Sequence, residues 1–529
     1  SGTGGSGGSV PSTTVGAGGA GGAGPTSVVG AGGTGGTGGA GGTGGGCARA
    51  CGANQACSPD LTSCVCTGGF ADCDGQASSG CEVDLLTSNA DCGACGKKCS
   101  AGDFCGGGLC QTPQVVDVAA GKGHSCAVFE KGILKCWGAN AAGQLGLEDN
   151  KARGDAADEM GANLPGVMLE SSIVSAVAVG ADHTCALLSD GLVKCWGAGA
   201  QGRLGRGDSV NIGDQPKEMG PKLLPVDLGV GVTVKALAAG DAHTCALLSD
   251  AKLKCWGAGA HGRLGLGDPA NRGDMKDEMG DNLPFVDLGP NEKVRALGAG
   301  AAFTCALLET EHVKCWGDNA KGQLGLGDTA NRGDMKDELG VNLKAVDLGT
   351  AVLAKKLAVG AAHACVVTDG AKVKCWGDNA KGQLGLGDKD PRGDAAGELG
   401  DQLPVIELGE NAVDVFARGN RSCARLASGA LKCWGDNAKG QLGLGDKDPR
   451  GDDANEMGEN LPSIILGMGF KLGRIGLGAA HGCVTSETGT VKCWGDNATG
   501  QLGLGDKNPR GDDANELGDA LPAVKLVGP

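Results

Sequence analysis

A motif that ends in Cys-Trp-Gly occurs seven times in this chain, and the seven copies contain every tryptophan of its 529 residues. Successive tryptophans lie 59, 60, 60, 60, 58 and 60 residues apart. They are Trp137, Trp196, Trp256, Trp316, Trp376, Trp434 and Trp494. A regular period is typical of folds built from repeated structural units that bury their surfaces against one another. The period therefore constrains the fold strongly, and it says much less about function.

Each copy contains four short segments with the pattern of β-strands, and in the second copy these are residues 174–180, 183–189, 192–197 and 224–229. Ser189, Asp190 and Gly191 separate the second segment from the third, and because glycine adopts a positive φ easily, a hairpin is expected there. One four-stranded unit cannot bury both of its faces, whereas seven arranged radially cover one another. The sequence therefore predicts an all-β, seven-bladed β-propeller.

Two cysteines face each other in every predicted hairpin. If three residues form the turn, Cys185 lies opposite Cys195, and the same ten-residue offset recurs in all seven copies. Directly opposed positions on antiparallel strands are close enough for a disulfide. We therefore predict seven hairpin disulfides. The pairs are Cys126 with Cys136, Cys185 with Cys195, Cys245 with Cys255, Cys305 with Cys315, Cys365 with Cys375, Cys423 with Cys433, and Cys483 with Cys493.

The repeat also resembles a known family. The strings Ala-x-Gly-x-x-His-x-Cys-Ala-Leu, Val-Lys-Cys-Trp-Gly-x-Asn and Gly-Gln-Leu-Gly-Leu-Gly-Asp are similar to the repeat of the regulator of chromosome condensation family, and residues 358–388 carry them almost whole. The resemblance covers about residues 115–529, and it implies a seven-bladed propeller. Two features depart from the family pattern: the paired cysteines of every hairpin, and an insert such as RGDMKDEMGDNLP (residues 272–284) in each long loop.

The resemblance further implies a guanine-nucleotide exchange factor that binds chromatin, as eukaryotic members of the family do. Exchange on a nuclear or cytosolic GTPase needs a reducing compartment and particular face loops, whereas this chain has paired cysteines and acidic loops. Its net charge of -16 and isoelectric point near 4.9 argue against a phosphate-binding surface. An exchange-factor-like regulator therefore stays an alternative by resemblance only, and we expect no nucleic-acid partner.

Two segments precede the propeller, which we assign to residues 113–529. Residues 1–46 contain only Gly, Ser, Thr, Ala, Val and Pro, so a flexible tether is expected. Residues 47–112 contain twelve cysteines and few large apolar residues, which predicts a small module held by disulfides. Its strings GGFADCDGQASSGCEVDL and NADCGACGKKCSAGDFCGGGLC resemble the stigma-specific-type cysteine-rich modules of myxobacterial surface proteins. Zinc binding or redox chemistry at Cys92 and Cys95 is the lesser alternative.

The 26 cysteines, all assignable to pairs, indicate an oxidising compartment, so we expect an extracellular or cell-surface protein. The resemblance to the myxobacterial modules implies a bacterial one. The chain begins with Ser1, which suggests processing, and a tether there fits an N-terminal surface anchor as well as a plain linker. The sequence has no run of eighteen or more apolar residues, so no transmembrane segment is expected.

No catalytic motif stands out. His183, Cys185 and Cys195 would share one strand face and offer a metal set, but Phe303 and Arg421 occupy the histidine position in two copies that keep both cysteines. We therefore interpret the repeated histidines as structural hydrogen-bonding residues. They are His124, His183, His243, His363 and His481.

We expect a non-catalytic binding or structural scaffold. The alternative is an extracellular enzyme that acts on polysaccharide through an unrecognised carboxylate site. A sialidase mechanism is excluded because its nucleophile is a tyrosine and the chain has none. A copy that breaks the consensus with clustered polar residues would favour a site, and residues 418–426 of the sixth copy are the candidate.

The acidic inserts are the most distinctive exposed feature. Between Asp436 and Pro462 seven acidic residues stand against three basic ones, and the glycines and prolines indicate a surface loop. Arg-Gly-Asp recurs at Arg153, Arg272, Arg332, Arg392, Arg450 and Arg510. The preferred interpretation is that each arginine pairs with a carboxylate such as Glu456 and pins its loop. Adhesion to an integrin-like receptor and calcium binding are the alternatives. The calcium candidates are Asp446, Asp448, Asp452 and Asp453.

Like charge repeated in register would give one face of a closed ring a negative rim, which attracts basic or polar partners and repels polyanions. We therefore expect the insert-bearing face to be the binding face, with Asp452, Asp453 and Glu456 as its candidate residues. Its partner is expected to be an unidentified protein or glycan. Apart from the calcium alternative, no cofactor is expected.

Overall fold

The computed structural model describes residues 54–57, 64–67, 69–73, 81–86, 88, 90–98, 104–106, 109–111, 113–170 and 172–527. The predicted tether, residues 1–46, lies outside the described residues. No helix in the described part of the chain is long and apolar enough to cross a membrane.

Three two-stranded antiparallel sheets are described within the predicted cysteine-rich module. They pair β1 (Gln55–Cys57) with β2 (Cys64–Cys66), β3 (Phe70–Ala71) with β4 (Val83–Asp84), and β5 (Phe104–Gly106) with β6 (Leu109–Gln111). Disulfides join Cys66 to Cys81 and Cys73 to Cys95, and Cys92 is also disulfide-bonded. Neither Cys92 nor Cys95 therefore offers a free thiolate to zinc.

Seven three-stranded antiparallel sheets follow, each with its strands in chain order, and we call them blades 1 to 7. Blade 1 has β7 (Val115–Ala120), β8 (His124–Phe129) and β9 (Leu134–Gly138); blade 2 has β10 (Val174–Val179), β11 (His183–Leu188) and β12 (Val193–Gly197); blade 3 has β13 (Val234–Ala239), β14 (His243–Leu248) and β15 (Leu253–Gly257); blade 4 has β16 (Val294–Ala299), β17 (Phe303–Leu308) and β18 (Val313–Gly317). Blade 5 has β19 (Ala354–Val359), β20 (His363–Thr368) and β21 (Val373–Gly377); blade 6 has β22 (Ala412–Arg418), β23 (Arg421–Leu426) and β24 (Leu431–Gly435); blade 7 has β25 (Leu472–Leu477), β26 (His481–Ser486) and β27 (Val491–Gly495).

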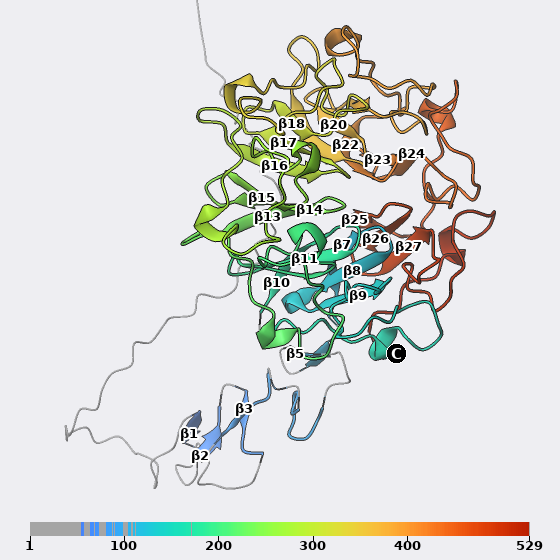
Figure 1. The fold of residues 1–529 in the computed structure, drawn as a ribbon. Coiled ribbons are helices and arrows are strands. Elements are labelled where there is room, and N and C mark those ends of the chain that lie inside the picture. Colours follow the sequence, from blue (N-terminus) through green and yellow to red (C-terminus); the bar gives the residue numbers. More distant parts are fainter. Residues whose placement is uncertain are drawn as a thin grey trace, which may run out of the picture.

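The blades form a closed ring. The first strands of neighbouring blades contact one another, which places them nearest the ring axis, and β25 of the last blade contacts β7 of the first. Figure 1 shows this closure, with the red strands of blade 7 beside the cyan strands of blade 1. The prediction of an all-β propeller is confirmed, and the seven blades follow the seven copies of the motif.

The fourth predicted strand of each copy is not a regular strand. In blade 2 only the Val226 amide of this segment bonds to the third strand, and it donates to the Val193 carbonyl at 2.7 Å. Pro225 has no N–H to donate, and the Asp227 carboxylate turns the chain away by accepting the Gly229 amide at 2.9 Å. The same bond recurs in the other blades at 2.8–3.0 Å, and in blades 5 and 6 it accompanies an isolated β-bridge, between Val373 and Ile406 and between Lys432 and Ser463. It joins Val167 to Leu134, Val286 to Leu253, Val346 to Val313, Ile406 to Val373, Ile464 to Leu431 and Val524 to Val491.

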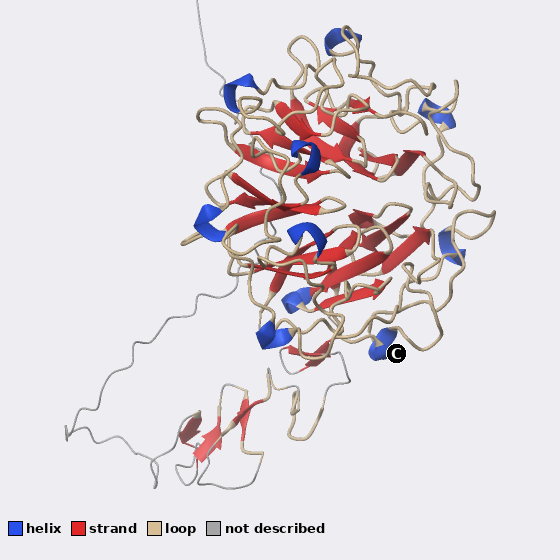
Figure 2. Cartoon of the chain, in the orientation of Figure 1, coloured by secondary structure: helices blue, strands red, loops and turns tan. Residues whose placement is uncertain are grey.

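Short 3₁₀ helices interrupt the loops, and Figure 2 shows them among the tan loops around the strands. They are η1 (Glu130–Gly132), η2 (Gly161–Asn163), η3 (Ala200–Gly202), η4 (Gly220–Lys222), η5 (Ala260–Gly262), η6 (Gly280–Asn282), η7 (Gly340–Asn342), η8 (Gly400–Gln402), η9 (Gly458–Asn460) and η10 (Gly518–Ala520).

The hairpin register places a cysteine opposite a cysteine in every blade. In blade 2 the Leu188 amide donates to the Leu192 carbonyl at 2.9 Å, so the turn has three residues, and Gly191 has a φ of +82°. The structure joins all seven predicted pairs as disulfides with Cα–Cα distances of 4.0–4.1 Å. These fourteen cysteines are at most 1 % exposed, so the bonds lie inside the propeller core.

Neighbouring blades are joined at a buried carbonyl. The Gln144 carbonyl of blade 1 accepts the Trp196 indole N–H at 3.1 Å and the Thr184 hydroxyl at 2.9 Å, both from blade 2. Because that hydroxyl has only one proton, it accepts from His124 Nε2 of blade 1 at 2.9 Å. Five histidines bond to a hydroxyl of the next blade at 2.8–2.9 Å, which agrees with their interpretation as structural residues.

The two copies without the histidine also differ in the partner residue on the next blade. Phe303 lies in one buried cluster with Ala364, which stands where five other blades have threonine or serine. Arg421 faces Gly482, where a Cβ would come within 3.3 Å of Nη2, and its guanidinium donates to the carbonyls of Gln441 and His481. The contact between blades therefore requires matched residues on both sides.

Because these histidines are buried and uncharged, we expect the stability of the propeller to fall at acidic pH. Burial lowers the pKa of His124, His243 and His481 to about 3, and that of His363 to about 4. Below pH 6.5 the unfolded chain binds protons that the folded chain does not, so the free energy of unfolding falls as the pH falls, by about 1.4 kcal/mol per histidine and pH unit. Urea denaturation between pH 7 and pH 5 measures this slope. In the variant His243→Phe/Thr304→Ala, which copies the Phe303–Ala364 contact, proton uptake on unfolding should drop by one, and an unchanged slope would contradict the assignment.

Each hairpin disulfide is expected to stabilise the propeller. A bond that closes a ten-residue loop contributes about 2–3 kcal/mol in the chain-entropy treatment. Replacing Cys185 and Cys195 together by serine should lower the free energy of unfolding by about that amount. Mass spectrometry of a non-reduced digest checks the seven pairings directly, and free thiols at these positions would refute them.

Candidate functional site

The Arg-Gly-Asp arginine of each insert pairs within its own loop. Arg450 Nη2 donates to Asp446 Oδ2 at 2.6 Å, and its Nη1 donates to the carbonyls of Asp448 and Pro449. The expected carboxylate, Glu456, is not the partner, so this part of the prediction is corrected. The same pair forms at 2.6–2.7 Å in the other five Arg-Gly-Asp loops. It joins Arg153 to Asp149, Arg272 to Asp268, Arg332 to Asp328, Arg392 to Asp388 and Arg510 to Asp506.

Glu456 holds the turn that follows the arginine. Its Oε2 accepts the Gly451 amide at 2.8 Å and the Asp453 amide at 3.0 Å. Glu516 makes the same bonds to Gly511 and Asp513 in blade 7. A carboxylate that satisfies two turn amides stabilises the loop, so of the predicted binding-face residues Glu456 has a structural role.

Asp452 is also engaged, in an ion pair between blades. It is only 6 % exposed, and Lys389 Nζ of blade 5 lies 3.1 Å from its carboxylate. Blades 6 and 7 repeat the contact through Lys447 and Asp512, and the ring closure uses Lys507 and Asp155, each at 3.0 Å. The first four blades have no lysine at this position. They carry Asn150, Ser209, Pro269 and Thr329.

Asp394 is the aspartate whose lysine partner is replaced, by Thr329 of the preceding blade. Asp394 lacks an ammonium partner, and burial together with the neighbouring Glu398 carboxylate raises its pKa. Where a lysine is present, the Asp452 carboxylate in turn raises the pKa of Lys389. The lysine therefore supplies a positive charge to this aspartate in three of the seven copies, whereas Asp274 and Asp334 accept a hydrogen bond from an asparagine of their own loop.

The four calcium candidates do not converge on one point through free carboxylates. Asp446 bonds to Arg450 and Asp452 to Lys389, while Asp448 and Asp453 are exposed. Among the described residues, carboxylate oxygens of Asp512, Asp513 and Glu516 lie within 4.8 Å of one another. Lys447 Nζ is 3.0 Å from Asp512 and 3.8 Å from Asp513, so the ammonium group of this lysine already neutralises part of the negative charge that a calcium ion would need.

The acidic rim is one-sided. Residues 378–404 of blade 5 hold six acidic and three basic residues, and residues 496–522 of blade 7 hold six and two. In blade 2, residues 198–225 hold three acidic and four basic residues. Residues 139–165 of blade 1 hold five acidic and two basic residues, whereas residues 258–284 of blade 3 hold five and three, and residues 318–344 of blade 4 hold five and four. The ring of negative charge expected from the repeats is therefore uneven, and we call its most acidic part, over blades 5, 6, 7 and 1, the acidic arc. Its exposed carboxylates include Asp448, Asp453 and Asp513.

The sixth copy breaks the repeat at the ring axis. Arg418 stands where the other six copies have glycine, and it crosses the axis to donate to the carbonyls of Ala239 at 2.7 Å and Val179 at 3.2 Å. The glycine is needed elsewhere because the histidine ring fills the space: a Cβ on Gly180 would lie 2.1 Å from His183 Cε1. Since Arg421 replaces that histidine in blade 6, a side chain fits there.

A cavity of about 200 Å³ opens at the axis beside Arg418. Its charged lining residues are Lys122, Asp241, Arg418 and Asp436. The Arg418 guanidinium lies 3.8 Å from the Asp241 carboxylate, and the Asp436 carboxylate accepts a hydrogen bond from the side-chain amide of Gln441 at 2.8 Å. Arg418 therefore closes the propeller axis by binding carbonyls of blades 2 and 3, which is a structural role for the residue that the sequence singled out.

Residues 87–463 match the RCC1-like domain, and residues 474–501 match the regulator of chromosome condensation (RCC1) repeat. The chain belongs to the RCC1-like propeller family. The ultraviolet-B receptor UVR8 of Arabidopsis thaliana is 29 % identical over 405 residues, which cover 75 % of this chain and 80 % of that receptor. The probable E3 ubiquitin-protein ligase HERC6 of Homo sapiens is 30 % identical over 51 % of this chain, and the match spans only 24 % of that protein.

Solved structures show the same fold. Prp20p of Saccharomyces cerevisiae aligns with a TM-score of 0.53 at 22 % identity, over 78 % of this chain and 87 % of that one. Human WBSCR16 aligns with a TM-score of 0.53 at 18 % identity, over 73 % of this chain and 92 % of that one.

The ion pairs between blades predict how the rim responds to charge. Lys389→Thr should lower the melting temperature because Asp452 loses its partner, and Thr329→Lys should raise it because Asp394 gains one. Differential scanning calorimetry at low and high salt measures the melting temperatures of the two variants. Calcium chloride should change neither melting temperature. A rise in melting temperature with calcium that is absent from an Asp512→Asn variant would instead establish a calcium site.

Proposed function

We propose that this RCC1-like protein is a secreted or surface-tethered binding scaffold, in which a disulfide-reinforced propeller presents its acidic arc to a basic protein. The observation that carries the proposal is the buried disulfide in every blade. Disulfides in such number form and persist in oxidising compartments. The cysteine-rich segment and the N-terminal tether would then link the propeller to a cell surface.

Protein binding is supported by the solved relatives. One structure holds Kap60 bound to yeast RCC1, and another describes the binding of Prp20p to Gsp1p and histones. The exchange-factor alternative suits this chain less well, because its propeller carries disulfides. The polysaccharide-acting enzyme is the other alternative, and the carboxylates of the inserts support it little, since Asp446, Asp452 and Glu456 are each engaged in holding the loops.

The acidic arc is the surface that best fits a basic partner. Asp448 and Asp453 are exposed in blade 6, and the Asp513 side chain of blade 7 is 76 % exposed. Exposed like charges add to a negative potential that raises the association rate of a cationic partner and weakens as salt screens it over about 10 Å at 0.1 M. The partner is therefore expected to dissociate at high ionic strength.

Two kinds of variant separate binding from loop stability. The triple variant Asp448→Asn/Asp453→Asn/Asp513→Asn should weaken binding about tenfold or more, as expected for three lost charges, and leave the melting temperature unchanged. Glu456→Gln should do the reverse, because its carboxylate bonds to backbone amides. Asp277→Asn on blade 3, outside the acidic arc, is the matched control.

The intact chain is first used as an affinity bait to capture its basic partner from the culture fluid of the organism that produces it. The parent and the variants are then titrated with that partner at several salt concentrations. Equal binding by the triple variant and the parent would exclude the acidic arc. Recovery of the protein from the cytosol with reduced cysteines would exclude the proposed location.

A further inference from the structure

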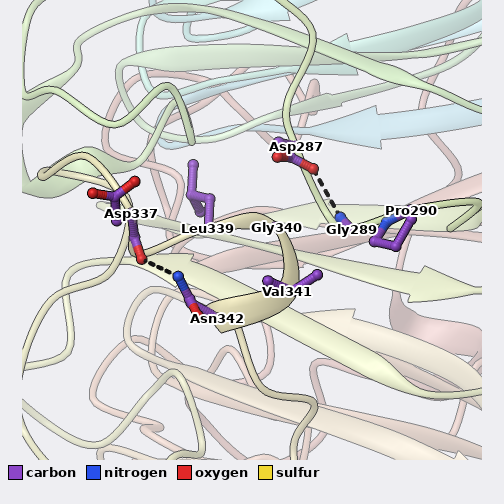
Figure 3. A pocket seen from close by; sticks show the side chains of 8 residues that line it. All are labelled: Asp287, Gly289, Pro290, Asp337, Leu339, Gly340, Val341 and Asn342. Carbon is purple, nitrogen blue, oxygen red and sulfur yellow. Dashed lines mark hydrogen bonds between the residues drawn. The ribbon is translucent and has the colours of Figure 1, made fainter.

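Two adjoining cavities form a groove on blades 3 and 4. They have volumes of about 520 and 500 Å³, and both are lined by Asp287 and Gly289. The first lies where the fourth segment of blade 3 meets residues 337–342 of blade 4, and Figure 3 shows Asp287 and Asp337 on its two sides. The second extends along the turn between β14 and β15 and contains Phe285. Cavities of this volume are in the range of small-molecule binding sites, and because they share lining residues one ligand of linked units can extend from one to the other.

Phe285 is the exposed aromatic residue of the propeller. Its side chain is 44 % exposed, whereas the seven tryptophans are fully buried, and no other aromatic residue within the described range 113–527 reaches that exposure. The equivalent position of the other blades holds a small or aliphatic residue: Gly166, Pro225, Ala345, Val405, Ser463 or Ala523. Because repeat architecture does not require an aromatic ring here, Phe285 calls for a local explanation.

Phe285 is not needed to stabilise the lysine side chains that lie over its ring. The ammonium groups of Lys252 and Lys254 each lie 4.8 Å from the Phe285 ring centroid. Lys254 also donates to the carbonyls of Leu228 and Gly280 at 2.8 Å, whereas the Lys252 side chain is 56 % exposed. In blade 5, Lys374 donates to the equivalent carbonyls of Leu348 and Gly400, although Val405 replaces the phenylalanine. Lys254 therefore keeps its hydrogen bonds with or without an aromatic neighbour, and the exposed Lys252 already pairs with Asp250, so neither lysine requires the ring.

The charges around the groove disfavour an anionic ligand. Lys252 pairs with Asp250 at 3.1 Å, and Lys314 lies 3.7 Å from Glu292. Among the described residues, Asp287 and Asp337 have no basic partner within salt-bridge distance, and Asp287 Oδ1 accepts the Gly289 amide at 2.9 Å. Four carboxylates and two lysines line the two cavities, so the groove combines an apolar ring with hydrogen-bond acceptors and a slight excess of negative charge. They are Asp250, Asp287, Glu292, Asp337, Lys252 and Lys293.

We propose that this groove binds a neutral oligosaccharide, with one sugar ring packed on Phe285 and sugar hydroxyls donating to Asp287 and Asp337. A sugar ring has an apolar C–H face that packs on an aromatic side chain, and its hydroxyls are donors for carboxylates. An extended peptide fits less well. It would add to the edge of β15, but the Leu253 carbonyl there already accepts the Val286 amide at 3.0 Å.

The test uses the full chain and five neutral hexasaccharides: cellohexaose, xylohexaose, maltohexaose, laminarihexaose and chitohexaose. At least one should bind in isothermal titration calorimetry, and Phe285→Ala should weaken that binding about tenfold or more, as loss of an aromatic packing surface does. Val405→Ala, at the equivalent position of blade 5, is the matched control and should bind like the parent. Asp287→Asn should also weaken binding, with its melting temperature recorded to exclude unfolding.

The outcome is independent of the acidic arc, because the triple variant Asp448→Asn/Asp453→Asn/Asp513→Asn should bind the hexasaccharide as the parent does. The proposal is overturned if none of the five sugars binds at millimolar concentration, or if Phe285→Ala and Val405→Ala bind equally well. It is equally overturned if a peptide library, and no sugar, yields ligands whose binding depends on Phe285.

Discussion

The propeller depends on one buried backbone carbonyl in each blade that accepts hydrogen bonds from the next blade. In blade 1 this is the Gln144 carbonyl, which binds both Trp196 and Thr184. The ring closes on the same contact, since the Gln501 carbonyl binds Trp137 and Ser125. Separate sheets share no continuous ladder, so these bonds and the apolar packing around them join the blades. The pairs Phe303 with Ala364 and Arg421 with Gly482 show that the residues beside the carbonyl change together.

Charged side chains of the inserts form ion pairs both within one loop and between neighbouring blades. The pair of Arg450 with Asp446 fixes one loop, and the pair of Lys389 with Asp452 joins that loop to the preceding blade. Most of the acidic residues that the repeats carry therefore maintain the architecture. The exposed carboxylates remain available to a partner. They are most numerous in the last three copies because additional aspartates occur there, at Asp390, Asp448, Asp453 and Asp513.

Repetition also separates structural residues from candidate functional ones. Residues present in every copy, such as the tryptophans and the hairpin cysteines, are fully buried and serve each blade alike. Arg418 and Phe285 each occur at a position where the other copies have a different, smaller residue. Arg418 donates to carbonyls across the axis, which accounts for its presence, whereas Phe285 remains exposed beside a groove. A site that occurs once is therefore sought among the departures from the repeat.

The sequence by itself determined the blades, the hairpin register and the cysteine pairs, because these follow from a three-residue turn and a ten-residue offset within one short segment. It also indicated that the histidines are structural, since Phe303 and Arg421 replace two of them. Only the tertiary structure decided that the fourth segment is not a strand, that Arg450 pairs with Asp446, and that Lys389 reaches Asp452. It also placed Arg418 on the axis, and Asp287 and Asp337 on the two sides of one cavity. Such contacts depend on the paths of long loops and on how neighbouring blades meet, and neither follows from local periodicity.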